Sequence, residues 1–149
     1  MMKIFRGDIE LDTIYEIKPD ELYARGIRYA LCDLDNTLAD YDTPLPTEQV
    51  KAWFCAMHDK GIRVAIVSNN GRTRVEKFCE SLDIPYFWKS GKPRRRAVRN
   101  ALAKLGGTAE QTVLIGDKRT TDVLCAKWAG ILSIKVKSIK PRTILWKKK

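Results

Sequence analysis

Two carboxylates, Asp33 and Asp35, directly follow an apolar run at residues 27–32. An apolar run bounded by polar residues is typical of a buried parallel strand, and side chains two positions apart lie on the same side of an extended chain. Two like charges held this close repel each other, and burial makes the repulsion more costly. A cation between them would offset that cost, and Mg²⁺ fits because it prefers carboxylate oxygens.

Further polar residues follow three other apolar runs, each at a point where a strand is predicted to end. The carboxyl ends of parallel strands meet at one edge of a sheet, and ligands bind there in folds of this kind. We therefore expect all of these polar residues to converge on one site. They are Ser68, Asn69 and Asn70 after residues 62–67, Lys92 after residues 84–88, and Asp117 with Asp122 after residues 112–115.

This set of residues is suited to phosphoryl transfer. A carboxylate can attack phosphorus and form an aspartyl-phosphate, provided that positive charge screens it from the dianionic substrate. From the residues alone, Mg²⁺ held by Asp33, Asp35 and Asp117 would supply part of this charge, and the Lys92 ammonium would supply the rest. Asp35 would protonate the leaving alkoxide and later activate water.

The phosphate group itself would be bound by residues after the second and third strands. Ser68 offers a hydroxyl donor, and Asn69 with the following amides adds further N–H donors. Lys92 supplies a positive charge, and it lies just before a helix that is predicted to begin at Pro93. The positive end of that helix would add to the attraction of a phosphate.

Each of these residues also has an ordinary structural interpretation when it is taken alone. The first two aspartates could form a turn or cap a helix, and residues 68–71 could be an ordinary turn. Lys92 could be one more solvated lysine, and Asp117 and Asp122 could be cap residues. The catalytic interpretation rests on their occurrence together, each group at the end of a predicted strand.

The apolar runs alternate with segments of helical periodicity. In residues 50–57 the apolar side chains recur at i, i+3, i+4 and i+7, which indicates an amphipathic helix that Thr47 can cap. Alternating strands and helices predict βαβ units and a parallel sheet with helices on both faces, which is a three-layer α/β architecture. About five strands are expected, at residues 27–32, 62–67, 84–88, 112–115 and 131–136.

The length of 149 residues fits a single domain that spans residues 1–149. We place its core at about residues 19–136, between an N-terminal arm, residues 1–18, and a basic tail, residues 137–149. Apolar residues alternate with acids in the arm, which suits either a short strand or an irregular packed segment.

The net charge of +10 attracts anions, which include nucleic acid, anionic lipid surfaces and phosphorylated substrates, without selecting among them. The runs at residues 94–96 and 147–149 are either solvated charge or a footprint for an anionic surface. Four cysteines without a CxxC motif and a single histidine argue against zinc and favour a reducing, cytoplasmic compartment. We find neither a secretory signal nor a membrane span in the sequence.

Four groups of residues resemble, in order and spacing, the motifs of the haloacid dehalogenase (HAD) superfamily: Asp33-Leu-Asp-Asn-Thr37, Ser68-Asn69, Lys92-Pro93, and Gly116-Asp117 with Asp122. The resemblance covers roughly residues 27 to 136 and implies the Rossmann-like fold of that superfamily.

The resemblance implies that Asp33 is the nucleophile and Asp35 the acid/base. Asp35 would then bind Mg²⁺ through its backbone carbonyl, beside Asp33 and Asp117, with Asp122 in a supporting role. An aspartate at the second position also indicates a phosphatase, because dehalogenation needs no proton donor there.

Within the superfamily, the sequence is similar to the YqeG-like group of subfamily IIIA, the phosphatidylglycerophosphate phosphatases. The similarity lies in residues 18–27 and 116–124. The sequence differs from that group in the basic pair Lys118-Arg119 and in a short, lysine-rich tail after Val136.

Cap domains of this superfamily are inserted after the first motif or between the second and third motifs. Here the corresponding segments, residues 36–46 and 70–91, are too short to fold alone. We therefore expect no cap domain and an open site. An open site suits a phosphate carried on a large body, such as a lipid in a membrane, a nucleic-acid end or a protein.

Three functions remain open at this point. The leading one is an Mg²⁺-dependent phosphomonoesterase that converts phosphatidylglycerophosphate to phosphatidylglycerol, with peripheral contact to the anionic inner membrane surface and no stable nucleic-acid partner. The second is a phosphatase of nucleic-acid ends or small phosphate esters, which predicts salt-sensitive nucleic-acid binding. The third is a basic nucleic-acid or ribosome binding module without activity, against which the intact cluster of acids argues. The sequence does not indicate an oligomeric state.

Overall fold

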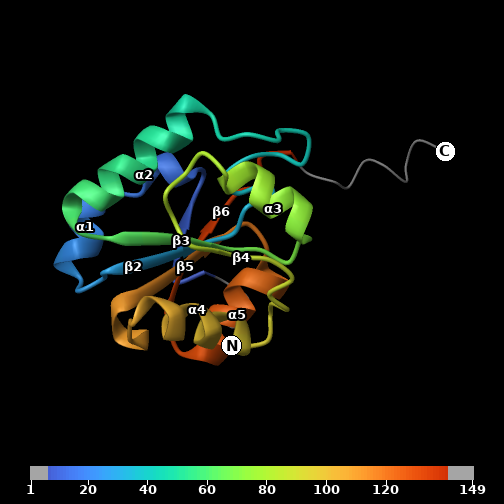
Figure 1. Ribbon diagram of the computed structural model, residues 1–149. Coiled ribbons are helices and arrows are strands. Elements are labelled where there is room, and N and C mark those ends of the chain that lie inside the picture. The colour runs from blue at the N-terminus through green and yellow to red at the C-terminus, as the bar shows by residue number, and fades with distance from the viewer. Residues whose placement is uncertain (1–6, 141–149) are drawn as a thin grey trace.

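The computed structural model describes residues 7–140, which form one parallel sheet with helices on both faces (Figure 1). The strand order is β1-β6-β5-β2-β3-β4. β2 is therefore central, and the winding of the chain reverses there, since β3 lies on one side of β2 and β5 on the other. The strands are β1 (Ile9–Leu11), β2 (Tyr29–Cys32), β3 (Arg63–Val67), β4 (Tyr86–Phe87), β5 (Thr112–Gly116) and β6 (Leu132–Val136).

The predicted three-layer α/β architecture is confirmed, but the sheet has six strands rather than about five. The additional strand is β1, which lies within the N-terminal arm and pairs with β6 in the register Ile9↔Ile134. Of the two alternatives for the arm, residues 9–11 adopt the short strand. An edge strand of three residues carries almost no periodicity, so the sequence could not distinguish the two. The basic tail beyond residue 140 lies outside the described residues.

The helices are divided between the two faces of the sheet (Figure 1). Successive residues of the central strand accordingly pack into different layers: Ala30 and Cys32 join the cluster on the α2 and α3 side, whereas Leu31 joins the cluster on the α4 and α5 side. Burial on both sides explains why the strand is apolar throughout. One face carries α1 (Pro19–Ala24), α2 (Glu48–Lys60) and α3 (Arg72–Cys79), and the other carries α4 (Arg96–Leu105) and α5 (Leu124–Ala129).

α2 begins where the sequence predicts, after Thr47, and ends at Lys60. Thr47 Oγ1 accepts the N–H of Val50 at 3.1 Å, which caps the helix. Gly61 ends the helix at a φ of 96°, a left-handed conformation that glycine adopts without strain. The predicted apolar face is buried, since Trp53 and Phe54 are 6% and 4% exposed.

α4 begins three residues later than predicted, at Arg96 rather than Pro93. The Arg94 N–H donates to the Gly91 carbonyl at 2.9 Å, so the residues after Lys92 form a turn before the helix starts. The predicted placement of the positive helix end directly after Lys92 is therefore wrong. The electrostatic attraction of a helix N-terminus falls off within one helical turn.

No cap domain interrupts the described part of the chain, as predicted. Residues 36–46 form a loop, and residues 70–91 contain only α3 and β4. Within residues 7–140, no helix combines the length and the apolar character that crossing a bilayer requires.

Candidate active site

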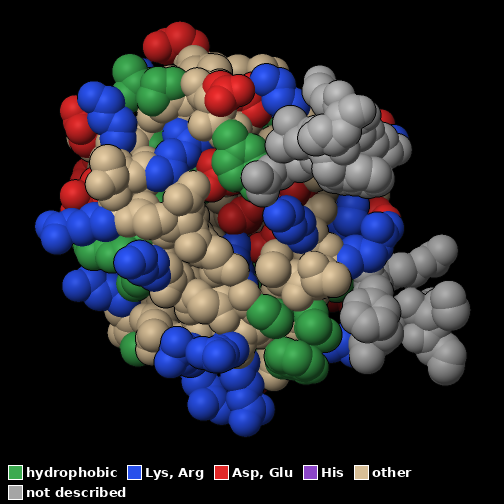
Figure 2. Space-filling view, turned by 90° about the vertical axis from the view of Figure 1, so that its right-hand side faces the viewer, with side chains coloured by type: hydrophobic (Ala, Val, Ile, Leu, Met, Phe, Trp, Pro, Cys, Tyr) green, Lys and Arg blue, Asp and Glu red, His purple; other side chains and the backbone are tan. Residues whose placement is uncertain are grey.

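The carboxyl ends of the central strands open into a pocket of about 240 Å³. Figure 2 looks onto this end of the sheet and shows acidic side chains at the bottom of a hollow. The predicted convergence is therefore observed for residues that follow β2, β3 and β4. The pocket is lined by Asp33, Asp35, Tyr41, Ser68, Asn69, Asn70, Lys92, Lys118 and Thr121.

Three carboxylates gather at the base of this pocket. Asp33 follows β2, Asp117 and Asp122 follow β5, and one oxygen of each lies within 4.8 Å of the others. Asp117 and Asp122 are 4% and 2% exposed, so water screens their mutual repulsion poorly. Two of the three, Asp33 and Asp122, form ion pairs with the same lysine, Lys92.

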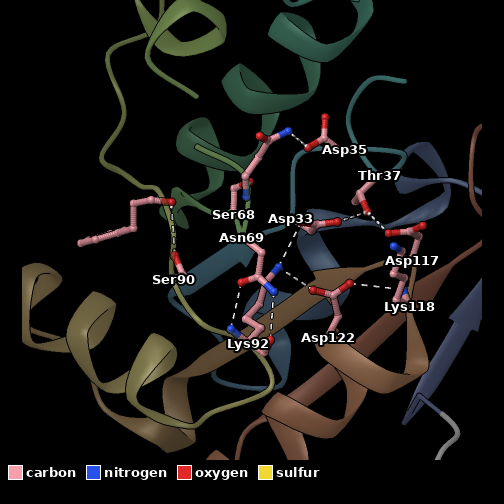
Figure 3. Close-up of polar contacts among 12 residues, drawn as sticks. Asp33, Asp35, Thr37, Ser68, Asn69, Ser90, Lys92, Asp117, Lys118 and Asp122 are labelled. Carbon is pink, nitrogen blue, oxygen red and sulfur yellow. Dashed lines mark hydrogen bonds and ion pairs between the residues drawn. The ribbon is translucent and has the colours of Figure 1, made fainter. Parts of the chain in front are cut away.

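Lys92 bridges two of the three carboxylates. Its Nζ donates to Asp33 Oδ1 at 3.0 Å and to Asp122 Oδ1 at 2.6 Å (Figure 3). Its side chain is 2% exposed. Burial alone would lower the pKa of Lys92, but the Asp122 and Asp33 carboxylates outweigh burial and raise it above its ordinary value. Lys92 is therefore a fixed positive charge at the base of the pocket.

Asp122 is positioned by a π-helical turn, Arg119–Val123, which leads directly into α5. The Lys118 N–H donates to Asp122 Oδ2 at 3.2 Å, so both oxygens of this carboxylate have donors. Burial raises the pKa of Asp122 to about 6, and repulsion from Asp33 acts in the same direction. Single π-helical turns of this kind recur at functional sites.

Gly116, the last residue of β5, lies directly against the Asp122 carboxyl group. A Cβ at this glycine would lie 2.2 Å from Asp122 Cγ, a distance that no side chain tolerates. The Gly116-Asp117 pair therefore has a packing role as well as a chemical one, since only glycine lets Asp122 reach Lys92.

Two hydroxyl groups contact the carboxylates away from Lys92. Thr37 Oγ1 lies 3.2 Å from Asp33 Oδ2 and 3.3 Å from Asp117 Oδ1, and the Ser138 hydroxyl donates to Asp117 Oδ2 at 2.6 Å. Burial raises the pKa of Asp33, the Lys92 ammonium opposes this rise, and the Asp117 carboxylate adds to it. Within the described residues, Asp117 has no cationic partner.

The oxygens of Asp33 and Asp117 fit a divalent cation such as Mg²⁺. They are hard donors that both contact the neutral Thr37 hydroxyl, and Mg²⁺ prefers such carboxylates. Asp122 is already bound by Lys92, and its supporting role stays a prediction. The carboxylate of Asp35 lies outside this acidic cluster, so a metal contact through its backbone carbonyl stays a prediction.

Ser138 reaches the site from a segment that the sequence did not single out. This segment follows β6 and is bound to the loop after β2: the Ile139 N–H donates to the Asn36 carbonyl at 3.1 Å, and the Lys140 N–H donates to Asn36 Oδ1 at 3.2 Å. Twenty-one positions separate Ser138 from Asp117, so no local pattern could have found this contact.

We expect Ser138→Ala to weaken Mg²⁺ binding by roughly tenfold, because loss of a partner that orients a ligating carboxylate typically costs that much affinity. Isothermal titration of Mg²⁺ into the free protein measures the effect without turnover. Ser138→Thr retains the hydroxyl and serves as the matched control. Equal affinities of the alanine variant and the wild type would show that Ser138 does not orient Asp117.

Ser68 follows β3 and is 1% exposed. Its Oγ accepts the Asn70 N–H at 2.9 Å, which leaves the hydroxyl proton for a phosphate oxygen. The Asn69 side chain instead pairs with the backbone of Lys92, donating to its carbonyl at 2.9 Å and accepting its N–H at 2.8 Å. A role of Asn69 in phosphate binding stays a prediction and would rest on its main-chain N–H.

Asp35 is held at the rim of the pocket by two donors. Asn70 Nδ2 donates to Asp35 Oδ2 at 2.8 Å (Figure 3), and Arg74 Nε donates to Asp35 Oδ1 at 3.1 Å. The Arg74 guanidinium also donates to the carbonyls of Asp40 and Thr43, so it ties the acid to its own loop. Sequence reasoning missed Arg74, because one arginine among the charges of α3 carries no distinctive signal.

Comparison with known proteins agrees with this geometry. Residues 2–130 match the family model described as haloacid dehalogenase-like hydrolase. The chain is 38% identical over 136 residues to a Bacillus subtilis (strain 168) protein named "Probable phosphatase YqeG", and the match covers 91% of this chain and 79% of that protein.

Two solved structures with lower identity share the fold. An uncharacterized protein from Listeria monocytogenes serotype 4b has a TM-score of 0.63 at 18% identity, with 78% of this chain and 84% of that chain covered. The Moraxella catarrhalis 3-deoxy-D-manno-octulosonate 8-phosphate phosphatase, solved with magnesium, phosphate and KDO, has a TM-score of 0.53 at 22% identity, with 66% and 63% covered. The chain therefore belongs to the haloacid dehalogenase-like hydrolases and, within them, to the family of the protein named "Probable phosphatase YqeG".

Proposed function

We propose that this protein is an Mg²⁺-dependent phosphomonoesterase that works through an aspartyl-phosphate on Asp33. One observation carries the proposal: the Asp33 carboxylate lines an open pocket and lies 3.0 Å from a buried lysine, which offsets the repulsion between an attacking anion and an anionic substrate. A solvated aspartate would lack this fixed positive charge.

The reaction divides into two displacements at phosphorus. In the first, an oxygen of Asp33 bonds to phosphorus while the bond to the leaving alkoxide breaks, and Asp35 gives that alkoxide a proton. In the second, Asp35 takes a proton from water, the water oxygen bonds to phosphorus, and the bond to Asp33 breaks, which releases inorganic phosphate and restores Asp33. This is general acid and base catalysis by one residue.

Three groups stabilise the charge that develops on the phosphoryl oxygens. Lys92 contributes its ammonium, and Ser68 contributes its hydroxyl proton. Mg²⁺ held by Asp33 and Asp117 would supply further positive charge at the phosphoryl oxygens. Asp122 keeps Lys92 in place through the 2.6 Å ion pair.

The proposed substrate is phosphatidylglycerophosphate, at the cytoplasmic face of the inner membrane. This lipid carries a phosphomonoester and, a few bonds away, a negatively charged phosphodiester. An open pocket with an exposed cation on its lining, Lys118, supports such a substrate, because a second phosphate could pair with that ammonium. The relationship to YqeG supports a phosphatase, and the open site accommodates a large substrate.

Phosphate release from a panel of esters tests the substrate. We expect the highest kcat/KM for phosphatidylglycerophosphate in mixed micelles, and lower values for glycerol 3-phosphate, sugar phosphates and oligonucleotides phosphorylated at the 5′ or 3′ end. Faster turnover of an oligonucleotide or a sugar phosphate would overturn the lipid assignment while leaving the phosphatase intact. Absence of phosphate release from every ester in Mg²⁺ would overturn the proposed activity itself.

We expect Lys118→Ala to lower kcat/KM for phosphatidylglycerophosphate by about tenfold, the value of one hydrogen bond to a charged group. The same variant should change kcat/KM for glycerol 3-phosphate, which has no second phosphate, by less than about twofold. Lys104→Ala, an exposed lysine at the far end of α4, is the matched control. An equal loss of kcat/KM on both substrates would mean that Lys118 does not bind the second phosphate.

A further inference from the structure

A second hollow, of about 500 Å³, lies beside the site and is lined by Arg94, Arg95, Arg96, Arg99 and Trp128. We call these five residues the arginine face. They come from the turn before α4, the first part of α4 and the end of α5. All four arginines are exposed, and Trp128 is 52% exposed, an unusual state for so large an apolar side chain.

The four arginines of this face have no acidic partner among residues 7–140. A neighbouring hollow of about 300 Å³ shares Arg96 and adds Trp88 and Lys89. The residues found to line the two hollows include no acid, so the surface is a continuous cationic area with two indole rings.

The arginine face lies close to the catalytic pocket. Arg94 is two residues after Lys92, and the turn between them connects the base of the pocket to the surface. In Figure 2, Lys and Arg side chains gather at the lower edge of the molecule, on the same face as the acidic hollow and at the α4 and α5 end. A planar anionic surface that contacts the arginine face would therefore lie near the opening of the catalytic pocket.

We propose that the arginine face docks the protein on the surface of an anionic phospholipid bilayer. Its composition is the reason: arginines attract anionic headgroups, and an exposed indole among them can enter the interface, where amphipathic rings are stable. A nucleic acid would also be attracted by the charge, but binding of single strands relies on a row of exposed aromatic platforms. Of the two indoles here only Trp128 is exposed, since Trp88 is half-buried and the Arg72 guanidinium lies 5.2 Å from the centre of its ring. Docking goes beyond the proposed catalysis, because it needs no turnover.

Vesicle sedimentation tests docking directly. The wild-type chain is used without Mg²⁺ or substrate, so that no turnover takes place. It is mixed with vesicles of phosphatidylglycerol and phosphatidylcholine, and separately with vesicles of phosphatidylcholine alone. We expect binding to the first kind only. Each arginine near the surface contributes roughly a fivefold increase in partitioning, so Arg95→Glu/Arg99→Glu should lower partitioning by at least about 25-fold.

The matched control is Arg25→Glu/Lys77→Glu, which makes the same change in net charge at exposed positions on the side of α1 and α3. Trp128→Ala should lower partitioning without changing net charge, which separates insertion of the indole from general electrostatics. Circular dichroism checks that each variant is folded, and glutamates at a helix N-terminus favour the helix. Hydrolysis of p-nitrophenyl phosphate should be unchanged in the Arg95/Arg99 variant.

Three outcomes would overturn the docking proposal. They are equal losses in the two charge-reversal variants, no binding to anionic vesicles at low salt, and binding to single-stranded RNA with an affinity that the Arg95/Arg99 variant loses while vesicle binding is unaffected. None of them bears on Asp33 chemistry, which the soluble ester reports. If the wild type does not hydrolyse p-nitrophenyl phosphate, that result would count against the proposed phosphatase activity and leave the docking proposal intact.

Discussion

Asp33→Asn is expected to abolish phosphate release from every ester, with a fall in kcat of at least about 10⁴-fold, the size typical for loss of a catalytic nucleophile. An amide cannot form the acyl-phosphate, because its nitrogen lone pair is delocalised and its oxygen carries no charge. The fold should remain, since the substitution preserves shape and removes one negative charge from a cluster of three carboxylates, two of which contact Lys92.

The measurement combines kinetics with trapping. Acid quenching during turnover of a phosphate-labelled ester should leave label on the wild-type chain and none on the Asp33→Asn variant. Asp59→Asn, an exposed aspartate on α2, is the matched control and should keep wild-type activity. Residual activity above about one per cent in the variant, with label on the chain, would show that a residue other than Asp33 is the nucleophile.

Lys92→Met should have the largest combined effect on activity and stability. Methionine has a similar length but no charge, so Asp33 and Asp122 lose their shared partner while they stay close to Asp117. Removing one member of a buried ion pair typically costs about 3–5 kcal/mol of the free energy of unfolding. We also expect kcat to fall by at least about 10³-fold, because a preorganised charge at the phosphoryl group is lost.

A second substitution separates the two effects. In Lys92→Met/Asp122→Asn the buried carboxylate that paired with the lysine becomes a neutral amide, so urea unfolding should recover about half of the lost free energy while activity stays absent. Lys104→Met is the matched control on the surface. A Lys92→Met variant that unfolds at the wild-type urea concentration would mean that the ion pairs contribute little, and a double variant with restored activity would exclude Lys92 from the chemistry.

The sequence by itself determined the α/β architecture and identified most of the residues that line the candidate active site. The continuous apolar run before Asp33 indicates a strand buried on both faces, and the alternation of strands with amphipathic helices leaves a parallel sheet as the simple solution. Once the sheet is parallel, polar residues at strand ends must share one edge. Asp33, Ser68 and Lys92 could therefore be assigned to one site without any knowledge of contacts.

Sequence reasoning failed where contacts depend on distant parts of the chain. β1 pairs with β6 across more than one hundred positions, and its three residues have no period of their own. The late start of α4 reflects a turn hydrogen bond that Pro93 does not signal. The π-helical turn that carries Asp122 places this side chain against Gly116, a contact that no helical periodicity encodes.

Only the tertiary structure decided how the acidic groups divide their roles. The strand order places β5 beside β2, so Asp117 and Asp122 reach Asp33. Asp35 lies apart from them and is bound by Asn70, from the loop after β3, and by Arg74 of α3. The same packing brings Ser138 to Asp117. Side-chain direction and burial set which carboxylate meets the lysine, which meets a hydroxyl and which stays at the rim, and these are properties of the assembled sheet rather than of spacing along the chain.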